Sequence, residues 1–148
     1  MTIEVEVAVE IARPRAEVAE IMFDPAHDAI WTTGVIDVRP GAPGPLRKGS
    51  RVERTVKFVG RRFAYAYDVL DADGRSFVEM EVAQPFPMKV RYELEDTARG
   101  TIARIRTHGD PGAFFSLAGP LLSRMVRRNI ANDLELLKEY VEGRAEGR

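Results

Sequence analysis

The first apolar residues of the chain alternate with polar ones. From Ile3 to Ile11 every odd position is apolar, and the even positions are glutamate or alanine. Because successive side chains of a β-strand point to opposite faces, this pattern predicts a strand with one buried face. Pro14 is well placed to begin a helix, and apolar residues at helical spacing continue to Phe23. We therefore expect one short helix after the strand and a second brief helix at Pro25–Trp31.

A loop separates this first part from a series of strands. After a short apolar run at Val35–Val38, the segment Arg39–Gly49 contains three prolines and three glycines, which is typical of a loop. The segments that follow alternate in the manner of strands and are separated by turn residues, so they predict successive hairpins of an antiparallel sheet. The expected strands are Arg51–Val59, Arg62–Asp71, Ser76–Ala83, Met88–Glu95 and Thr101–Gly109.

The last third of the chain predicts one long amphipathic helix at Pro120–Glu142. One face of this helix is apolar and the other is charged, so the apolar face requires a large partner such as the sheet. Gly143 is expected to end the helix, because helices often end on a glycine in the left-handed conformation. We expect the helix to begin at Gly119 or Pro120, with Phe114–Ala118 as a separate turn or a kinked extension.

Two polar residues interrupt the apolar face of this helix. Asn129 and Asp133 lie one helical turn apart within it. Either each satisfies a nearby backbone group or water at the helix edge, or both line a cavity. Arg54 shares the predicted inner face of its strand with Val52, Val56 and Phe58, and an inward guanidinium requires a carboxylate. We therefore expect Arg54 and Asp133 to form an ion pair across the interior.

The predicted inner face of the sheet is apolar and aromatic, with few polar groups. This composition suits a ligand pocket, and it equally suits a filled core whose tyrosine hydroxyls reach the surface. Trp31 lies either in the core or at a cavity rim, and His108 is expected to be exposed and not catalytic. Catalytic residues stay unassigned, and the candidate ligand-binding residues are Trp31, Arg54, Phe58, Tyr65, Tyr67, Met80, Tyr92, Phe115, Val126, Asn129 and Asp133.

Composition narrows the classes of function. A chain of 148 residues predicts one domain, for which we expect residues 1–143, with 144–148 as a frayed tail. The net charge of −1 gives no general attraction for nucleic acid. Without cysteine and with two distant histidines, neither a metal site nor a bound cofactor is expected. The first residues resemble neither a signal peptide nor a membrane span, so we expect a cytoplasmic protein, and an arginine-to-lysine ratio of eighteen to four suggests a bacterial source.

Several features together resemble the SRPBCC (START-like) superfamily over nearly the whole chain, most closely its polyketide cyclase/dehydrase branch. They are the helix start PRAEV at Pro14–Val18, Trp31, Gly49 before a strand, Val69, and DLELLKEYVE at Asp133–Glu142. The resemblance implies an α+β helix-grip fold, in which a curved antiparallel sheet of six to seven strands wraps a long C-terminal helix and leaves a cavity. The element order argues against cystatin-like and nuclear-transport-factor-like cones, which begin with their helices.

Three functions follow from these patterns. The first is binding of a hydrophobic or aromatic small molecule between the sheet and the closing helix. The second is a polyketide aromatase, cyclase or dehydratase that uses Arg54, Tyr65, Tyr67 or Asp133, although no fixed catalytic motif is present. The third is a lipid carrier or interaction domain that docks through apolar residues beside arginines, without stable membrane insertion. The sequence leaves open whether the protein forms a homodimer. The docking residues would be Phe114, Phe115, Leu117, Leu121 and Leu122 beside Arg124, Arg127 and Arg128.

Overall fold

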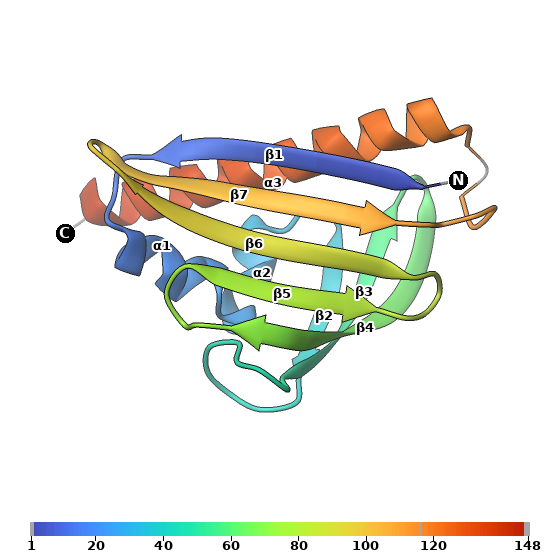
Figure 1. The fold of residues 1–148 in the computed structure, drawn as a ribbon, viewed down its shortest axis with the longest axis horizontal. Helices are drawn as coiled ribbons and strands as arrows, with labels where there is room; N and C mark the ends of the chain where they lie inside the picture. The colour runs from blue at the N-terminus through green and yellow to red at the C-terminus, as the bar shows by residue number, and fades with distance from the viewer. Residues whose placement is uncertain (1, 116, 147–148) are drawn as a thin grey trace.

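The computed structural model describes residues 2–115 and 117–146, with side chains described up to Arg144. Seven antiparallel strands form one curved sheet in the order β1-β7-β6-β5-β4-β3-β2 (Figure 1). This arrangement confirms the predicted helix-grip fold. The strands are β1 (Ile3–Ile11), β2 (Val35–Pro40), β3 (Arg51–Phe58), β4 (Arg61–Ala72), β5 (Phe77–Val82), β6 (Met88–Thr97) and β7 (Gly100–Gly109). The helices are α1 (Arg15–Met22), the 3-10 turn η1 (Pro25–His27), α2 (Asp28–Trp31) and α3 (Gly119–Glu146).

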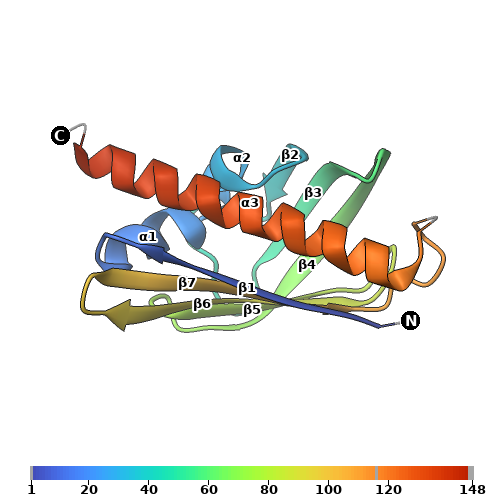
Figure 2. The ribbon, with the colours of Figure 1, turned by 90° about the horizontal axis from the view of Figure 1, so that it is seen from above.

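All helices lie on one side of the sheet. Figure 2 shows α3 running lengthwise over the sheet, with α1 and α2 on the same side, while β2, β3 and β4 rise toward the helices. The inward residues of the strands and the apolar face of α3 form one continuous core. Leu122, Leu134 and Leu137 of α3 are among its most buried side chains. The amphipathic pattern of the closing helix thus finds the large apolar partner that it requires.

Helix α3 also protects one edge of the sheet. Strand β1 pairs with β7 on one side, and no strand of the described residues pairs with its other side. Two cations of α3 reach its outer carbonyl groups: Arg127 donates to the carbonyl oxygen of Glu6 at 3.0 Å, and Lys138 donates to that of Glu10 at 2.8 Å. An unpaired strand edge is a template for aggregation, so these contacts both anchor α3 and cover the exposed backbone.

The far end of α3 differs from the prediction. Gly143 does not end the helix, which continues through Glu146, and its φ is not in the left-handed region. Val141, near this end, is buried, and Arg144 contacts Glu20 of α1 at 3.5 Å. Tertiary contacts on both sides of Gly143 therefore outweigh the low helix propensity of glycine. Arg144 lies within α3 and contacts Glu20, the frayed tail of residues 144–148 stays a prediction, and residues 147 and 148 lie outside the described residues.

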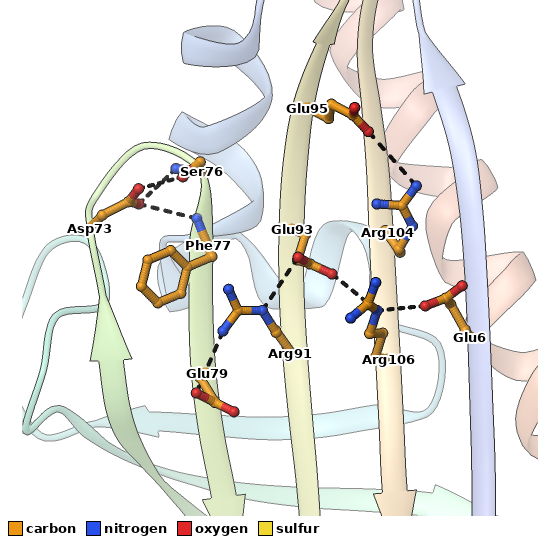
Figure 3. Close-up of polar contacts among 10 residues, drawn as sticks. All are labelled: Glu6, Asp73, Ser76, Phe77, Glu79, Arg91, Glu93, Glu95, Arg104 and Arg106. Carbon is orange, nitrogen blue, oxygen red and sulfur yellow. Dashed lines mark hydrogen bonds and ion pairs between the residues drawn. The ribbon is translucent and has the colours of Figure 1, made fainter.

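The outer face of the sheet carries a row of ion pairs (Figure 3). Glu93 lies between Arg91, at 3.4 Å, and Arg106, at 3.1 Å. Arg106 continues the row to Glu6 of β1, and Arg91 continues it to Glu79 of β5. Opposite charges on neighbouring strands support the register of the sheet. These charged positions of β1, β5, β6 and β7 thus lie on the outer face, and the cavity described below lies on the inner one.

Candidate functional site

A cavity of about 200 Å³ lies between the sheet and α3. Most of the residues that line it are apolar or aromatic, and the polar ones are few. The space between the sheet and α3 is therefore not completely filled by side chains. Nine of the predicted ligand-binding residues line this cavity: Trp31, Arg54, Phe58, Tyr65, Tyr92, Phe115, Val126, Asn129 and Asp133.

Two predicted site residues do not line the cavity. Tyr67 and Met80 are each 2% exposed and belong to the packed core. The guanidinium carbon of Arg54 instead lies over the Tyr67 ring, 4.9 Å from the centre of that ring. Alternation along a strand predicts which side chains point inward, but it does not predict how far along the strand a cavity extends. Direct ligand contact by these two residues stays a prediction that the geometry does not favour.

The predicted ion pair between Arg54 and Asp133 is wrong. Both side chains are buried, but Arg54 binds Asp28 of α2, with its Nε at 3.1 Å and its Nη2 at 2.6 Å from the same carboxylate oxygen. Its Nη1 donates to the hydroxyl of Tyr65 at 3.1 Å. The reason is that α2 places Asp28, three residues before Trp31, on the same buried helix face. The spacing of Asp28 and Trp31 is a local hint of this shared face, but a helix of one turn is too short for the pattern to identify Asp28 as the partner.

Burial of the Arg54–Asp28 pair has opposite effects on its two members. Burial raises the pKa of Asp28, and the charge of Arg54 opposes that rise. Burial alone would lower the pKa of Arg54, but Tyr65 and Asp28 outweigh this effect and hold it well above its ordinary value. Since an arginine keeps its proton in proteins, the pair is best described as a cation bound to an anion, with little net charge.

Asp133 has a different partner, the segment that follows α2. Its Oδ1 accepts a hydrogen bond from the backbone N–H of Thr33 at 2.7 Å, and the neighbouring Asn132 donates to the Thr33 hydroxyl at 2.8 Å. The first of the two sequence alternatives, a satisfied backbone group, therefore holds for Asp133, and the second holds as well because Asp133 lines the cavity. Burial raises the pKa of Asp133 to about 6, against the lowering effects of Thr33 and Arg54.

Two polar atoms near this carboxylate lack partners. The indole Nε1 of Trp31 and the hydroxyl of Thr32 are buried and make no hydrogen bond to any described residue. Both residues line the cavity. The Trp31 ring packs edge-on against Tyr92 at 5.7 Å, and burial raises the pKa of Tyr92 to about 12, so that its hydroxyl keeps its proton. Neutral hydrogen-bonding groups therefore belong to this part of the wall, where the Trp31 and Thr32 atoms are covered by neighbouring atoms in the free protein.

Another part of the wall belongs to an aromatic cluster, in which Phe58, Phe63, Phe86 and Phe115 line the cavity and Phe114 packs against them from behind the lining. The cluster joins the β3–β4 hairpin, the β5–β6 loop and the segment before α3. Arg61 holds this last segment, because its Nη1 donates to the carbonyl oxygen of Phe114 at 2.6 Å and its guanidinium group lies 3.9 Å from the Phe114 ring centre. Sequence reasoning missed Phe63 and Phe86 as lining residues, although both are aromatic residues beside turns.

The described residues also limit other kinds of site. They contain no group of three or more histidine, aspartate or glutamate side chains arranged to hold a metal ion. None of the helices in the described part of the chain combines the length and the apolar character that crossing a bilayer requires.

Solved structures similar to this one share its fold at low sequence identity. A START superfamily protein from Mycobacterium smegmatis is 15% identical, with a TM-score of 0.77 and coverage of 95% of this chain and 97% of that one. Protein NE0264 from Nitrosomonas europaea is 17% identical, with a TM-score of 0.75 and coverage of 99% and 97%. The di-domain ARO/CYC StfQ from the steffimycin biosynthetic pathway is 12% identical, with a TM-score of 0.78 over 99% of this chain and 53% of that one.

Sequence comparison adds the family. No protein with a curated description matches the chain. The sequence profile of the family described as "Polyketide cyclase / dehydrase and lipid transport" matches residues 2–142, which is nearly the whole chain. The match agrees with the START-like fold and with the SRPBCC resemblance. The chain is therefore a member of the polyketide cyclase / dehydrase and lipid transport family.

Proposed function

We propose that this protein binds a hydrophobic or aromatic small molecule in the cavity between the sheet and α3. The observation that supports the proposal is the cavity itself, with its largely apolar wall and its few buried polar groups. Its volume of about 200 Å³ is below the roughly 300–1,000 Å³ of pockets for drug-sized ligands. The ligand is therefore small, with one or two rings, unless the aromatic cluster moves to enlarge the cavity.

Binding can be tested by native mass spectrometry of gently purified protein and by calorimetric titration with panels of small lipids, polyketides and flavonoids. Val126→Phe places a phenyl ring into the cavity from α3, and we expect it to reduce affinity at least tenfold. The control is Leu121→Phe, which makes the substitution at an exposed position of the same helix and should leave affinity unchanged. Equal affinity of the two variants would show that ligands bind elsewhere.

Catalysis by a polyketide aromatase, cyclase or dehydratase is the second candidate. The observation that favours it is Asp133, a cavity carboxylate whose pKa of about 6 suits proton transfer near neutral pH. Asp133→Asn should then abolish turnover of any accepted substrate and preserve substrate binding. Glu135→Gln, which removes a carboxylate from the exposed face of α3, is the control. Unchanged turnover in Asp133→Asn would remove Asp133 from the reaction.

A lipid carrier or interaction domain that docks through the segment before α3 has less support. Phe115 and Leu122 are buried and line the cavity, so they are not available to an outside surface. Leu121, which is 45% exposed, is the apolar residue of this group that faces solvent. A single exposed leucine is ordinary on a protein surface and does not indicate a docking site.

A further inference from the structure

The polar groups of the cavity gather where α2 ends beside α3. Trp31 is the last residue of α2, Thr32 caps it, and Thr33 follows. Asp133 of α3 is tied to this segment by its hydrogen bond from the Thr33 backbone. All four residues line the cavity, whereas the aromatic cluster provides an apolar part of the wall. An amphipathic ligand would therefore place its polar end against the segment that follows Trp31.

The unpartnered atoms define the hydrogen bonds that such a polar end should make. The Nε1 of Trp31 is buried without a partner among the described residues, and an indole N–H can only donate. This nitrogen has almost no accessible surface in the free protein, so an acceptor oxygen of a ligand reaches it only if the wall around Trp31 shifts on binding. The carboxylate of Asp133 can accept more hydrogen bonds than the Thr33 segment donates, so it has capacity for a ligand hydroxyl.

The charges around the cavity define what net charge the ligand can carry. The positive charge of Arg54 is already neutralised by Asp28, through two hydrogen bonds to one carboxylate oxygen. Asp133 has no cation in direct contact among the described residues. Lys57, the other cation at the wall, is exposed, so solvent screens its attraction for a buried anion. A second buried carboxylate would thus lack a cation to balance it.

We propose that this cavity selects an uncharged ligand, which accepts a hydrogen bond from Trp31 and donates one to Asp133, and that it rejects the carboxylate of the same shape. Hydroxylated aromatic ketones belong to the accepted class, and fatty acids and aromatic acids belong to the rejected one. This inference rests on the proposed binding function and adds the polarity and charge of the ligand to it.

A pair of matched probes tests the proposal. 6-Hydroxy-2-acetylnaphthalene and 6-hydroxy-2-naphthoate have the same two rings and nearly the same shape, and they differ in charge. At pH 8, where Asp133 and the naphthoate carboxylate are both ionised, calorimetry should give at least tenfold higher affinity for the ketone. Asp133→Asn should reduce this preference severalfold by improving naphthoate binding, whereas Glu135→Gln should leave it unchanged.

A second variant tests the donor. Trp31→Phe removes the indole N–H and keeps an aromatic ring beside Tyr92. It should weaken ketone binding about three- to tenfold, as expected for the loss of one hydrogen bond. Binding of 6-hydroxy-2-ethylnaphthalene, which lacks the carbonyl group, should not change. This analogue, which keeps the hydroxyl group and lacks only the carbonyl, also shows whether the variant keeps a folded cavity.

The outcomes separate this inference from the proposed function. If the naphthols bind but the carboxylate binds as well as the ketone, the inference is overturned and the binding function stands. A preference for the ketone that Asp133→Asn leaves intact would overturn the role given to the Asp133 charge. If neither these probes nor the wider panels bind, the proposed function fails, and the inference fails with it. The comparison in the unmodified protein decides the main point even if a variant does not fold.

Discussion

At the scale of single residues, Asp133 is a buried carboxylate whose charge should cost stability in the folded protein. Burial raises its pKa to about 6, from about 3.9 in an unfolded chain. Between these values the folded protein holds a proton that the unfolded chain has lost. The stabilisation from this proton is complete below about pH 4 and is lost as pH rises through 6. Above pH 6 the folded state therefore carries a buried, destabilising anion.

Asp133→Asn should consequently stabilise the protein at pH 8, by about 2 to 3 kcal/mol, because the amide oxygen can still accept from Thr33 without carrying charge. The advantage of the variant should shrink as pH falls from 6 to 4. Urea unfolding of both proteins at several pH values measures this difference in the free energy of unfolding. Arg54 of β3 is the charged group that acts on Asp133, and it and its partner Asp28 are common to both proteins. A variant less stable than the unmodified protein at pH 8 would contradict this account.

The pair of Arg54 and Asp28 differs from Asp133, because removal of one charge of the pair should destabilise the protein. Removing one member leaves an uncompensated charge in the core, so Asp28→Ala should lower the free energy of unfolding by about 3 to 5 kcal/mol. The double variant with Arg54→Leu should recover part of this loss. Asp68→Ala is the control, because it breaks an exposed pair with Arg51 at 2.8 Å and should cost less than about 1 kcal/mol. Additive effects of the two core changes would show that the pair is not coupled.

The residue scale is also where sequence reasoning was weakest. It recognised that Arg54 points inward and that Asp133 interrupts an apolar face, and both side chains are buried. The sequence predicts a pair between them because each is the charged residue that the pattern places inward on its element. The true partner, Asp28, lies on a helix of one turn, which is too short to show a periodic pattern. Choice of partner depends on where such short elements pack, and that information is not local.

At the scale of elements, periodic patterns predicted the structure well. The alternation of the strands and the amphipathic face of α3 place each element close to its observed bounds, because burial of one face determines both patterns. The error at Gly143 has a different origin. Glycine is a common end of helices, but here contacts made by Val141 and Arg144 hold the helix on both sides of it.

Two glycines give a direct test of this correction. Gly143→Ala should stabilise the protein by about 0.5 to 1 kcal/mol, because Gly143 is helical and an added methyl group has no neighbour within 4 Å. If Gly143 were instead a left-handed helix end, alanine would destabilise it. Gly100→Ala is the contrasting variant, since φ is +152° and the new methyl carbon would lie 2.2 Å from the carbonyl oxygen of Ile11. In thermal unfolding, the melting temperature should rise for Gly143→Ala and fall for Gly100→Ala.

At the scale of the whole molecule, the fold separates stability from binding. The outer face of the sheet is crossed by the ion pairs of Figure 3, and the edge strand β1 is covered by cations from α3. The inner face leaves about 200 Å³ without side chains, although protein interiors are normally close-packed. The family fold could be expected from the order of the elements. The size of this cavity could not, because it depends on how all inward side chains pack together.

A cavity that is kept for a ligand should cost stability in the free protein. Removal of buried atoms destabilises proteins by about 24 cal/mol per Å³ of cavity, so a phenyl ring that occupies part of this space should stabilise it by about 1 kcal/mol. Val126→Phe is therefore expected to melt about 2 to 4 °C higher than the unmodified protein without ligand, and to lose the increase that ligand gives to the unmodified protein. Leu121→Phe should keep the melting temperature of the unmodified protein and its increase with ligand. A lower melting temperature for Val126→Phe would mean that the ring does not fit and that this part of the interior is already packed.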